Sequence, residues 1–239
     1  MPTSVPAPKA PRVHVADPRD WAFAQGTDFY LNAGTTTALI TSGTAGQVLS
    51  EYGWTTTALA YVAGSAADYA DSADPGVSPH LLLADASDLL ASPAIFGSYN
   101  HVLQAAHILG YTPTRLICEA YAAFTTSSNN ESSSAFGFVE DGGVVITAAA
   151  ADQLACISSD GTNFQLRSGA ANDAGALVDT VWHLWRIVIT SANCEWFMDG
   201  TSQGTIALEA DEFPVSFEAG IVAAGANDLA LGDVRVWYE

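Results

Sequence analysis

The second half of the chain, from about residue 114 onward, is divided into strand-length apolar runs by short turns. Several of these turns contain Asp followed by Gly: Asp141-Gly142, Asp160-Gly161 and Asp199-Gly200. Asp-Gly between two apolar runs is a strong hairpin signal, because the central residues of a tight turn need positive φ. Roughly ten such runs, with no long helical pattern among them, predict a β-sandwich or a β-barrel.

The clearest pair of strands lies in residues 179–200, DTVWHLWRIVITSANCEWFMDG. Side chains of a strand alternate between its two faces, so one face of the first strand carries Trp185, Ile187 and Ile189. The opposite face carries Trp182, Leu184, Arg186 and Val188. Both faces are largely apolar, which predicts a strand inside a sheet that is covered on both sides. One face of the second strand carries Cys194, Trp196 and Met198.

The same stretch resembles a known group of β-sandwich domains. A strand W-H-x-x-R-I-V-I, a polar break and a strand ending in F-x-D-G are similar to segments of the concanavalin A-like lectin/glucanase sandwiches, which include laminin G-like modules. Four further segments follow the order of that group: RLICEAYAAF, SSSAFGFVEDGG, ACISSDGTNFQLRSG and LGDVRVWYE. The resemblance covers about residues 114–239. It implies an all-β, concanavalin A-like jelly-roll sandwich of two antiparallel sheets, with most of these aromatic residues in the core.

The rest of the chain is predicted to complete the sandwich and to add an arm. Residues 1–20 are rich in proline and contain three basic residues, a composition that favours an extended N-terminal arm. Residues 21–239 are predicted to form one β-sandwich domain, with short strands in residues 21–113. Within that part, DASDLLASPAIF predicts a helical turn ended by Pro93. The segment NHVLQAAHILG fits either a short helix ended by Gly110 or a strand.

The net charge of −19 argues against one class of partner. A strongly acidic surface repels phosphate backbones, so we expect no nucleic-acid binding. No apolar run reaches the ~18 residues of a membrane helix, and the N-terminal residues lack the apolar centre of a secretory signal. We therefore expect no membrane partner and no export. Three cysteines without C-x-x-C spacing are expected to be small buried apolar residues: Cys118, Cys156 and Cys194.

The sequence contains no recognisable catalytic or metal-binding motif. Glycosidases of the resembled group carry an E-x-D-x-x-E strand, whereas here Glu209-Ala-Asp211 is followed at once by Glu212. Two other acids stand alone on predicted strands, Glu119 and Glu195. G-x-S-x-G, H-E-x-x-H, a calcium-loop signature and a Gly-rich phosphate loop are all missing. We therefore predict no catalytic residue, no metal, no cofactor and no enzymatic activity.

The leading hypothesis is a non-enzymatic structural protein of a tailed bacteriophage, a capsid decoration or cement protein. Its basis is the missing catalytic pattern, the basic arm on an acidic body, the many small residues and an analogy of layout, although fold alone does not imply function. Such a protein would be located in the virion and assembled in the host cytoplasm. Its expected partners are other virion proteins, above all the major capsid protein, and further copies of itself. The arm would make the contact through Lys9, Arg12 and Arg19.

Two alternatives remain open. In a carbohydrate-binding, lectin-like module, an exposed aromatic side chain would contact a surface glycan, with Trp182 or Trp237 as that residue. The third hypothesis is a degenerate glycoside hydrolase, which would need two carboxylates about 5–10 Å apart in a cleft.

Overall fold

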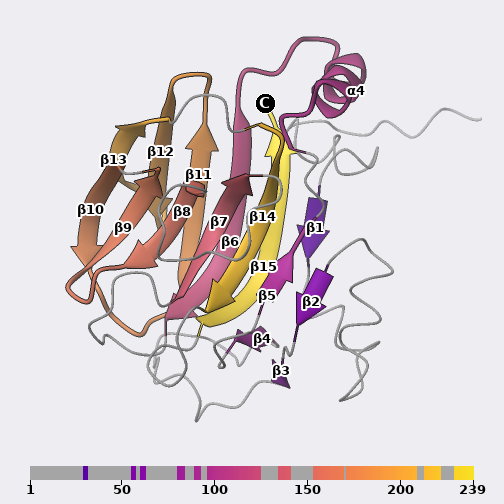
Figure 1. Cartoon of the computed structure of the whole chain (residues 1–239). Helices are drawn as coiled ribbons and strands as arrows, with labels where there is room; N and C mark the ends of the chain where they lie inside the picture. The colour runs from indigo at the N-terminus through magenta and orange to yellow at the C-terminus, as the bar shows by residue number, and fades with distance from the viewer. Residues whose placement is uncertain are drawn as a thin grey trace, which may run out of the picture.

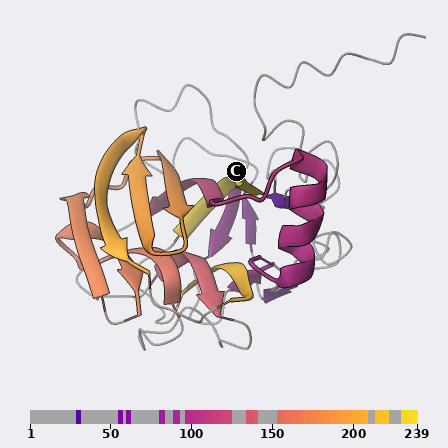
Figure 2. The same ribbon diagram turned by 90° about the horizontal axis from the view of Figure 1, so that it is seen from above.

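The computed structural model describes residues 29–31, 55–57, 60–62, 80–83, 89–92, 96–124, 134–140, 153–169, 171–208, 213–221 and 229–239. In this part of the chain, two antiparallel sheets form the two layers of a sandwich, and a helix lies at its side (Figures 1 and 2). The predicted all-β jelly-roll sandwich is thereby confirmed. The predicted arm, residues 1–20, lies outside the described residues.

The larger sheet has eight strands in the described part of the chain. Seven are hydrogen-bonded neighbours in the order β13 (Thr201–Ala207), β12 (Asn193–Met198), β11 (His183–Ile189), β6 (Leu116–Phe124), β15 (Leu229–Tyr238), β4 (His80–Leu83) and β3 (Ala60–Val62). The eighth, β1 (Phe29–Leu31), pairs with the second half of β15, with Phe29 opposite Val236. Strands from the beginning of the chain therefore join the long strands of its second half.

The smaller sheet has seven strands within the same described ranges. Their order is β10 (Ala171–Leu177), β9 (Asn163–Ser168), β8 (Gln153–Ser159), β7 (Ser134–Glu140), β14 (Val215–Ile221), β5 (Leu89–Ala91) and β2 (Thr55–Thr57). β10 and β13, the end strands of the two sheets, contact each other and close one side of the sandwich. β5 pairs with β14 and so extends this sheet with residues from the first half of the chain.

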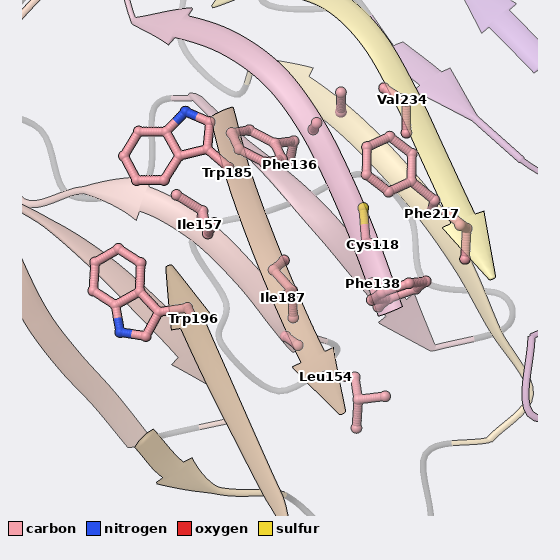
Figure 3. Packing of buried hydrophobic residues seen from close by; sticks show 14 of the residues in the cluster. Cys118, Phe136, Phe138, Leu154, Ile157, Trp185, Ile187, Trp196, Phe217 and Val234 are labelled. Carbon is pink, nitrogen blue, oxygen red and sulfur yellow. The ribbon is translucent and has the colours of Figure 1, made fainter. Parts of the chain in front are cut away.

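Trp185 lies at the centre of the core between the two sheets (Figure 3). Its side chain is 1% exposed, and its ring is 4.8 Å from the ring of Phe164 and 6.3 Å from the nearly parallel ring of Trp196. Its Nε1 donates a hydrogen bond of 3.1 Å to the backbone carbonyl of Ala122 on β6. The one polar atom of this indole is therefore satisfied inside an apolar core.

The inner face of β11 carries the three residues that the alternation of the strand predicts. Trp185, Ile187 and Ile189 are buried between the sheets, and β11 lies inside its sheet between β12 and β6. The expectation that both faces are covered is wrong for the outer face, where Leu184 is 44% exposed. The physical reason lies next to it: Arg186 keeps its charged group at the surface, where Nε donates to Glu119 at 2.7 Å.

The segment around residue 100 forms a helix. α4 (Tyr99–Leu109) begins after Ser98, whose hydroxyl accepts from the amide of His101, and ends at Gly110, which has a left-handed φ of 78°. The alternative of a strand is thereby excluded. The hydroxyl of Tyr238 at the end of β15 accepts from the amide of Gly97 at 2.7 Å and lies 3.1 Å from Nδ1 of His101, which anchors α4 to the larger sheet. Among the described residues, no helix is both long and apolar enough to cross a membrane.

The prediction of a helical turn in DASDLLASPAIF is wrong where the structure describes that segment. Leu89–Ala91 is strand β5, and Leu90 is fully buried in the core. A run of only three strand residues shows no usable periodicity. Pairing with β14 and β2 on either side decides its conformation instead.

The W-H and D-G residues of the motif meet through His183, the first residue of β11. Its Nδ1 lies 2.6 Å from Oδ2 of Asp199, and its Nε2 lies 2.9 Å from Oδ1 of Asp179. A ring with a carboxylate at each nitrogen carries a proton on both. Asp199 also accepts from the amide of Leu184 at 2.9 Å and, with Gly200, forms the turn between β12 and β13 at positive φ. The motif therefore serves the fold, because it fixes this turn to the start of β11.

Replacement of Trp185 by alanine should lower the free energy of unfolding by about 3–5 kcal/mol, because it removes a large buried ring and leaves a cavity. Chemical denaturation followed by circular dichroism measures the change. Leu184→Ala on the exposed face of the same strand is the control and should cost less than about 1 kcal/mol. Equal losses in the two variants would contradict the assignment of the core face.

His183 should make stability depend on pH. Burial by itself lowers the pKa of His183, but the hydrogen bonds to Asp199 and Asp179 outweigh burial and raise that pKa above its usual value of 6.5. The stabilisation is therefore fully present below pH 6.5 and is lost as pH rises through the folded-state pKa. The difference in unfolding free energy between the wild type and His183→Gln should shrink as pH rises from 6.5 through the folded-state pKa of His183. His107→Gln, on the exposed side of α4, should follow the wild-type profile.

Candidate functional site

The outer face of the seven-stranded sheet carries four residues in register, which we call the outer row. Backbone pairing places Glu218 of β14 opposite Gly137 of β7, Gly137 opposite Cys156 of β8, and Cys156 opposite Arg167 of β9. Side chains alternate along each strand, so Phe217 enters the core while Glu218 takes the outer face. The outer row therefore brings an acid and a base to one face of one sheet.

Gly137 leaves the outer row without a side chain between Glu218 and Cys156. Its φ is +146°, and a Cβ at this position would overlap the carbonyl oxygen of Ala155 and lie 2.8 Å from the Cα of Cys156. Backbone atoms cannot move aside as the end of a flexible side chain can, so the position requires glycine. The next pair on the same face, Gly220 and Ala135, is also small. The sheet surface beside Glu218 therefore carries no large side chain.

Arg167 is held by two polar neighbours on the same face. Ser158 and Gln165 pair across β8 and β9. The side-chain oxygen of Gln165 accepts from Nε and Nη2 of Arg167 at 3.0 and 3.1 Å and from the hydroxyl of Ser158 at 3.2 Å, with the amide oriented by these donors. Arg167 is 9% exposed. A planar group bonded through two of its nitrogens is held in a fixed orientation.

Glu218 is the most unusual group of the outer row. It is 5% exposed, and its Oε1 accepts a hydrogen bond of 3.0 Å from the hydroxyl of Ser216, while Oε2 has no hydrogen-bond partner. Burial raises the pKa of Glu218 to about 7, against a smaller opposing effect of the bond from Ser216. Near neutral pH the carboxyl is therefore poised between a hydrogen-bond donor and an acceptor. A buried polar atom without a partner is rare in folded proteins, which makes Glu218 the candidate functional residue of the outer row.

Cys156 does not supply a nucleophile to this site. Its thiol is fully buried and donates to the backbone carbonyl of Phe138 at 3.2 Å. Burial, followed by the nearby charge of Glu218, raises the pKa of Cys156 well above its ordinary value. A thiol is reactive as the thiolate, so this one is inert near neutral pH. All three cysteines are free and buried, as predicted.

The two tryptophans proposed for glycan contact are not exposed. Trp182 is 7% exposed and stacks on Tyr121 with 4.8 Å between ring centroids. Trp237 is 0% exposed, its Nε1 donates to Glu239 at 3.2 Å, and the guanidinium of Arg235 lies 5.7 Å from its ring. Both rings are therefore buried, which agrees with the expectation that most of these aromatic residues are not exposed. A glycan contact through either residue stays an untested prediction.

The other residues singled out from the sequence are dispersed. Glu119 pairs with Arg186, and Glu195 accepts from Ser202 at 3.1 Å, both on the outer face of the larger sheet. In the described ranges, no group of three or more His, Cys, Asp or Glu side chains could hold a metal ion. The remaining residues lie outside the described part of the chain: Glu209, Asp211 and Glu212, and the arm residues Lys9, Arg12 and Arg19.

The outer row itself was not predicted, although the sequence holds a signal for part of it. In the run S-F-E, an acid stands in a strand and alternates with the apolar Phe217, and in Q-L-R two polar residues alternate around Leu166. Each run alone is typical of any strand with one solvated face. Only the strand order, which places β7 and β8 between β14 and β9, brings Glu218 and Arg167 into one row.

Comparison with known proteins shows similarity at the level of the fold, to solved structures. No protein family matches the sequence, and no curated protein matches it. Among solved structures, a carbohydrate esterase from the Shiga toxin-encoding bacteriophage phi24B is similar, with a TM-score of 0.51 and 13% identity over 87% of this chain and 96% of that chain. At that identity the likeness concerns fold alone. It is consistent with a concanavalin A-like jelly roll.

Two other solved structures are similar at lower scores. A sialidase matches with a TM-score of 0.44 and 11% identity over 78% of this chain and 17% of that chain. The binding domain of botulinum neurotoxin serotype D matches with a TM-score of 0.44 and 7% identity over 68% of this chain and 40% of that chain. This chain thus spans less than half the length of either protein.

Replacement of Glu218 by glutamine should flatten part of the pH dependence of stability. Because the folded-state pKa of Glu218 is raised to about 7 from 4.5, the folded protein holds this proton more tightly than the unfolded chain does. The wild type should therefore lose stability, relative to Glu218→Gln, as pH rises from 4.5 to about 7. The relative loss should be on the order of 3 kcal/mol. Urea unfolding of both proteins across this window measures it, and Glu140→Gln at the end of β7 should leave the wild-type profile unchanged.

Proposed function

We propose that this chain is a non-enzymatic structural protein of a tailed bacteriophage virion, a capsid decoration or cement protein. The observation that supports it best is the fold shared with a bacteriophage protein over 87% of this chain and 96% of the other. The correspondence extends beyond the strands of residues 114–239 to the first half of the chain. We assign the sandwich to the laminin G-like group as part of this proposal, because its W-H and D-G residues are joined through His183.

The chemistry of the described polar residues supports a role without turnover. Glu119 is paired with Arg186, which removes it as a free acid or base. Glu218 is the single carboxylate of the outer row, whereas glycoside hydrolysis uses two carboxyl groups about 5–10 Å apart. Cys156 is fully buried and is no nucleophile.

Quantitative mass spectrometry of purified particles tests the structural role. A decoration protein should be present in many copies per particle, in a fixed ratio to the major capsid protein. Particles produced without the gene should lack the protein and regain it when the purified chain is added. Absence of the chain from intact particles would contradict the proposal, whatever its fold.

A carbohydrate-binding module is the second candidate, and the outer row is the observation that favours it. Glu218 holds a carboxyl group beside the small residues Gly137, Gly220 and Ala135 on one face. A carboxyl group of this kind complements the hydroxyl groups of a sugar. A sugar hydroxyl bound here would supply the hydrogen bond that Oε2 of Glu218 lacks.

A glycan array probed with the wild type, Glu218→Gln and Glu195→Gln tests the second candidate. A ligand of the outer row should bind the wild type and Glu195→Gln alike and should bind Glu218→Gln differently, because Glu195 lies on the other sheet. Equal binding of a glycan by the wild type and Glu218→Gln would exclude the outer row as its binding site. Breakdown of a bound glycan that is lost in Glu218→Gln would instead show an enzyme and overturn the absence of turnover.

A further inference from the structure

A mainly apolar pocket with a volume of about 370 Å³ lies beside α4, where β15 ends (Figure 1). Four parts of the chain meet there: α4 with the loop that follows it, the turn between β11 and β12, Phe213 before β14, and the end of β15. We call this depression the α4 pocket. Its apolar lining residues are Val102, Pro113, Leu116, Ile189, Phe213 and Tyr238.

Two aromatic side chains form walls of the α4 pocket, and both contact Gly97. The hydroxyl of Tyr238 accepts from the amide of Gly97 at 2.7 Å and lies 3.1 Å from Nδ1 of His101. The ring of Phe213 lies so close to Gly97 that a Cβ at this position would overlap it. Gly97 also has a φ of +76°, which favours glycine. The two walls are therefore formed by the fold itself, as in most small-molecule sites.

Arg115 is the charged group of the α4 pocket. Of the described residues that line the pocket, it alone carries a charge. Its side chain is exposed, and among the described residues its guanidinium takes part in no ion pair or hydrogen bond. Two further exposed residues of the lining, Thr114 and Ser191, carry hydroxyl groups. Guanidinium and hydroxyl groups both donate hydrogen bonds, so this side of the pocket is suited to an anionic group.

The surroundings of Arg115 are less acidic than the chain as a whole. A second depression, of about 290 Å³, adjoins the α4 pocket and shares Arg115 with it. The other charged residues of its described lining are Arg186, Glu195 and Glu239, so the charges of the two depressions cancel. The net charge of the chain is −19, which repels anions in general. An anion can approach Arg115 from the apolar side, where the described lining contains no acid.

We propose that the α4 pocket binds a small amphipathic anion, with its apolar body between Phe213 and Tyr238 and its carboxylate or sulfonate group at Arg115. The planar guanidinium matches the geometry of such a group. The volume of about 370 Å³ lies within the range of about 300–1,000 Å³ that is usual for small-molecule sites. The inference goes beyond the proposed virion role, because it assigns a ligand to the folded chain and not a place in a particle.

Fluorescence titration of the purified full chain with two probes tests the site. The anionic probe is 1-anilinonaphthalene-8-sulfonate, and the neutral probe is N-phenyl-1-naphthylamine, which has the same ring system without the sulfonate. The wild type should bind one molecule of the anionic probe. Arg115→Gln should weaken binding of the anionic probe about tenfold, because a charge-assisted contact is lost. The same variant should bind the neutral probe as the wild type does, because the apolar walls are unchanged.

Two further variants and one competition complete the measurement. Arg235→Gln is the matched control, because it removes the same charge from a residue that belongs to the described lining of neither depression, and it should bind both probes like the wild type. Ser191→Trp adds a large ring at the exposed edge of the pocket and should weaken both probes. Decanoate should displace the anionic probe at concentrations where decan-1-ol does not. Thermal melting of each variant verifies its fold.

Several results would overturn the proposal. Equal affinity of the wild type and Arg115→Gln for the anionic probe would place its binding elsewhere, and so would a folded Ser191→Trp that binds both probes normally. An equal effect of Arg235→Gln would show a general charge effect. Uptake of many probe molecules per chain would show adsorption to apolar surface. All of these concern the isolated protein, whereas the virion role is decided by the composition of particles, so the two proposals can fail separately.

Discussion

The packing of Trp185 between the sheets is the contact on which the rest of the sandwich depends. Its ring joins β11 of the larger sheet to Phe164 on β9 of the smaller one, and its Nε1 is bonded to β6. One side chain thereby fixes the distance between the layers and the position of β11 along β6, where Trp185 pairs with Ala120. Because strand registers follow from one another across a sheet, this position also sets Glu119 opposite Arg186 on the outer face.

The described outer faces use their polar groups in different ways. On the larger sheet the acids have partners: Glu119 is bonded to Arg186, and Glu195 accepts from Ser202. On the smaller sheet Glu218 keeps one carboxylate oxygen without a bond in a buried position, which is unfavourable unless something else is gained.

The local sequence pattern predicts much of the fold but little of the candidate site. Alternation in HLWRIVI identifies Trp185, Ile187 and Ile189 as core, and Ser98 and Gly110 delimit α4 as capping residues do. Strand β5 was missed because three residues hold no period, and its pairing partners are distant in sequence. Alternation did not decide whether Trp182 or Trp237 reaches solvent, because it gives the face of a residue and not what covers that face. Glu218 and Arg167 were missed as a pair because their proximity depends on strand order.

Gly137 has a consequence for how relatives of this chain could be recognised. Whole-sequence identity to the similar bacteriophage structure is only 13%, too low to trace descent position by position. At residue 137 the backbone of β8 lies so close that a hydrogen atom is the only substituent that fits. A homologous domain with the same irregularity between β7 and β8 is therefore bound to retain glycine there, however far the rest has drifted. Glycine at that position, with an acid opposite it in the next strand, would mark shared ancestry of the outer row more selectively than the W-H motif, which fixes a turn through His183.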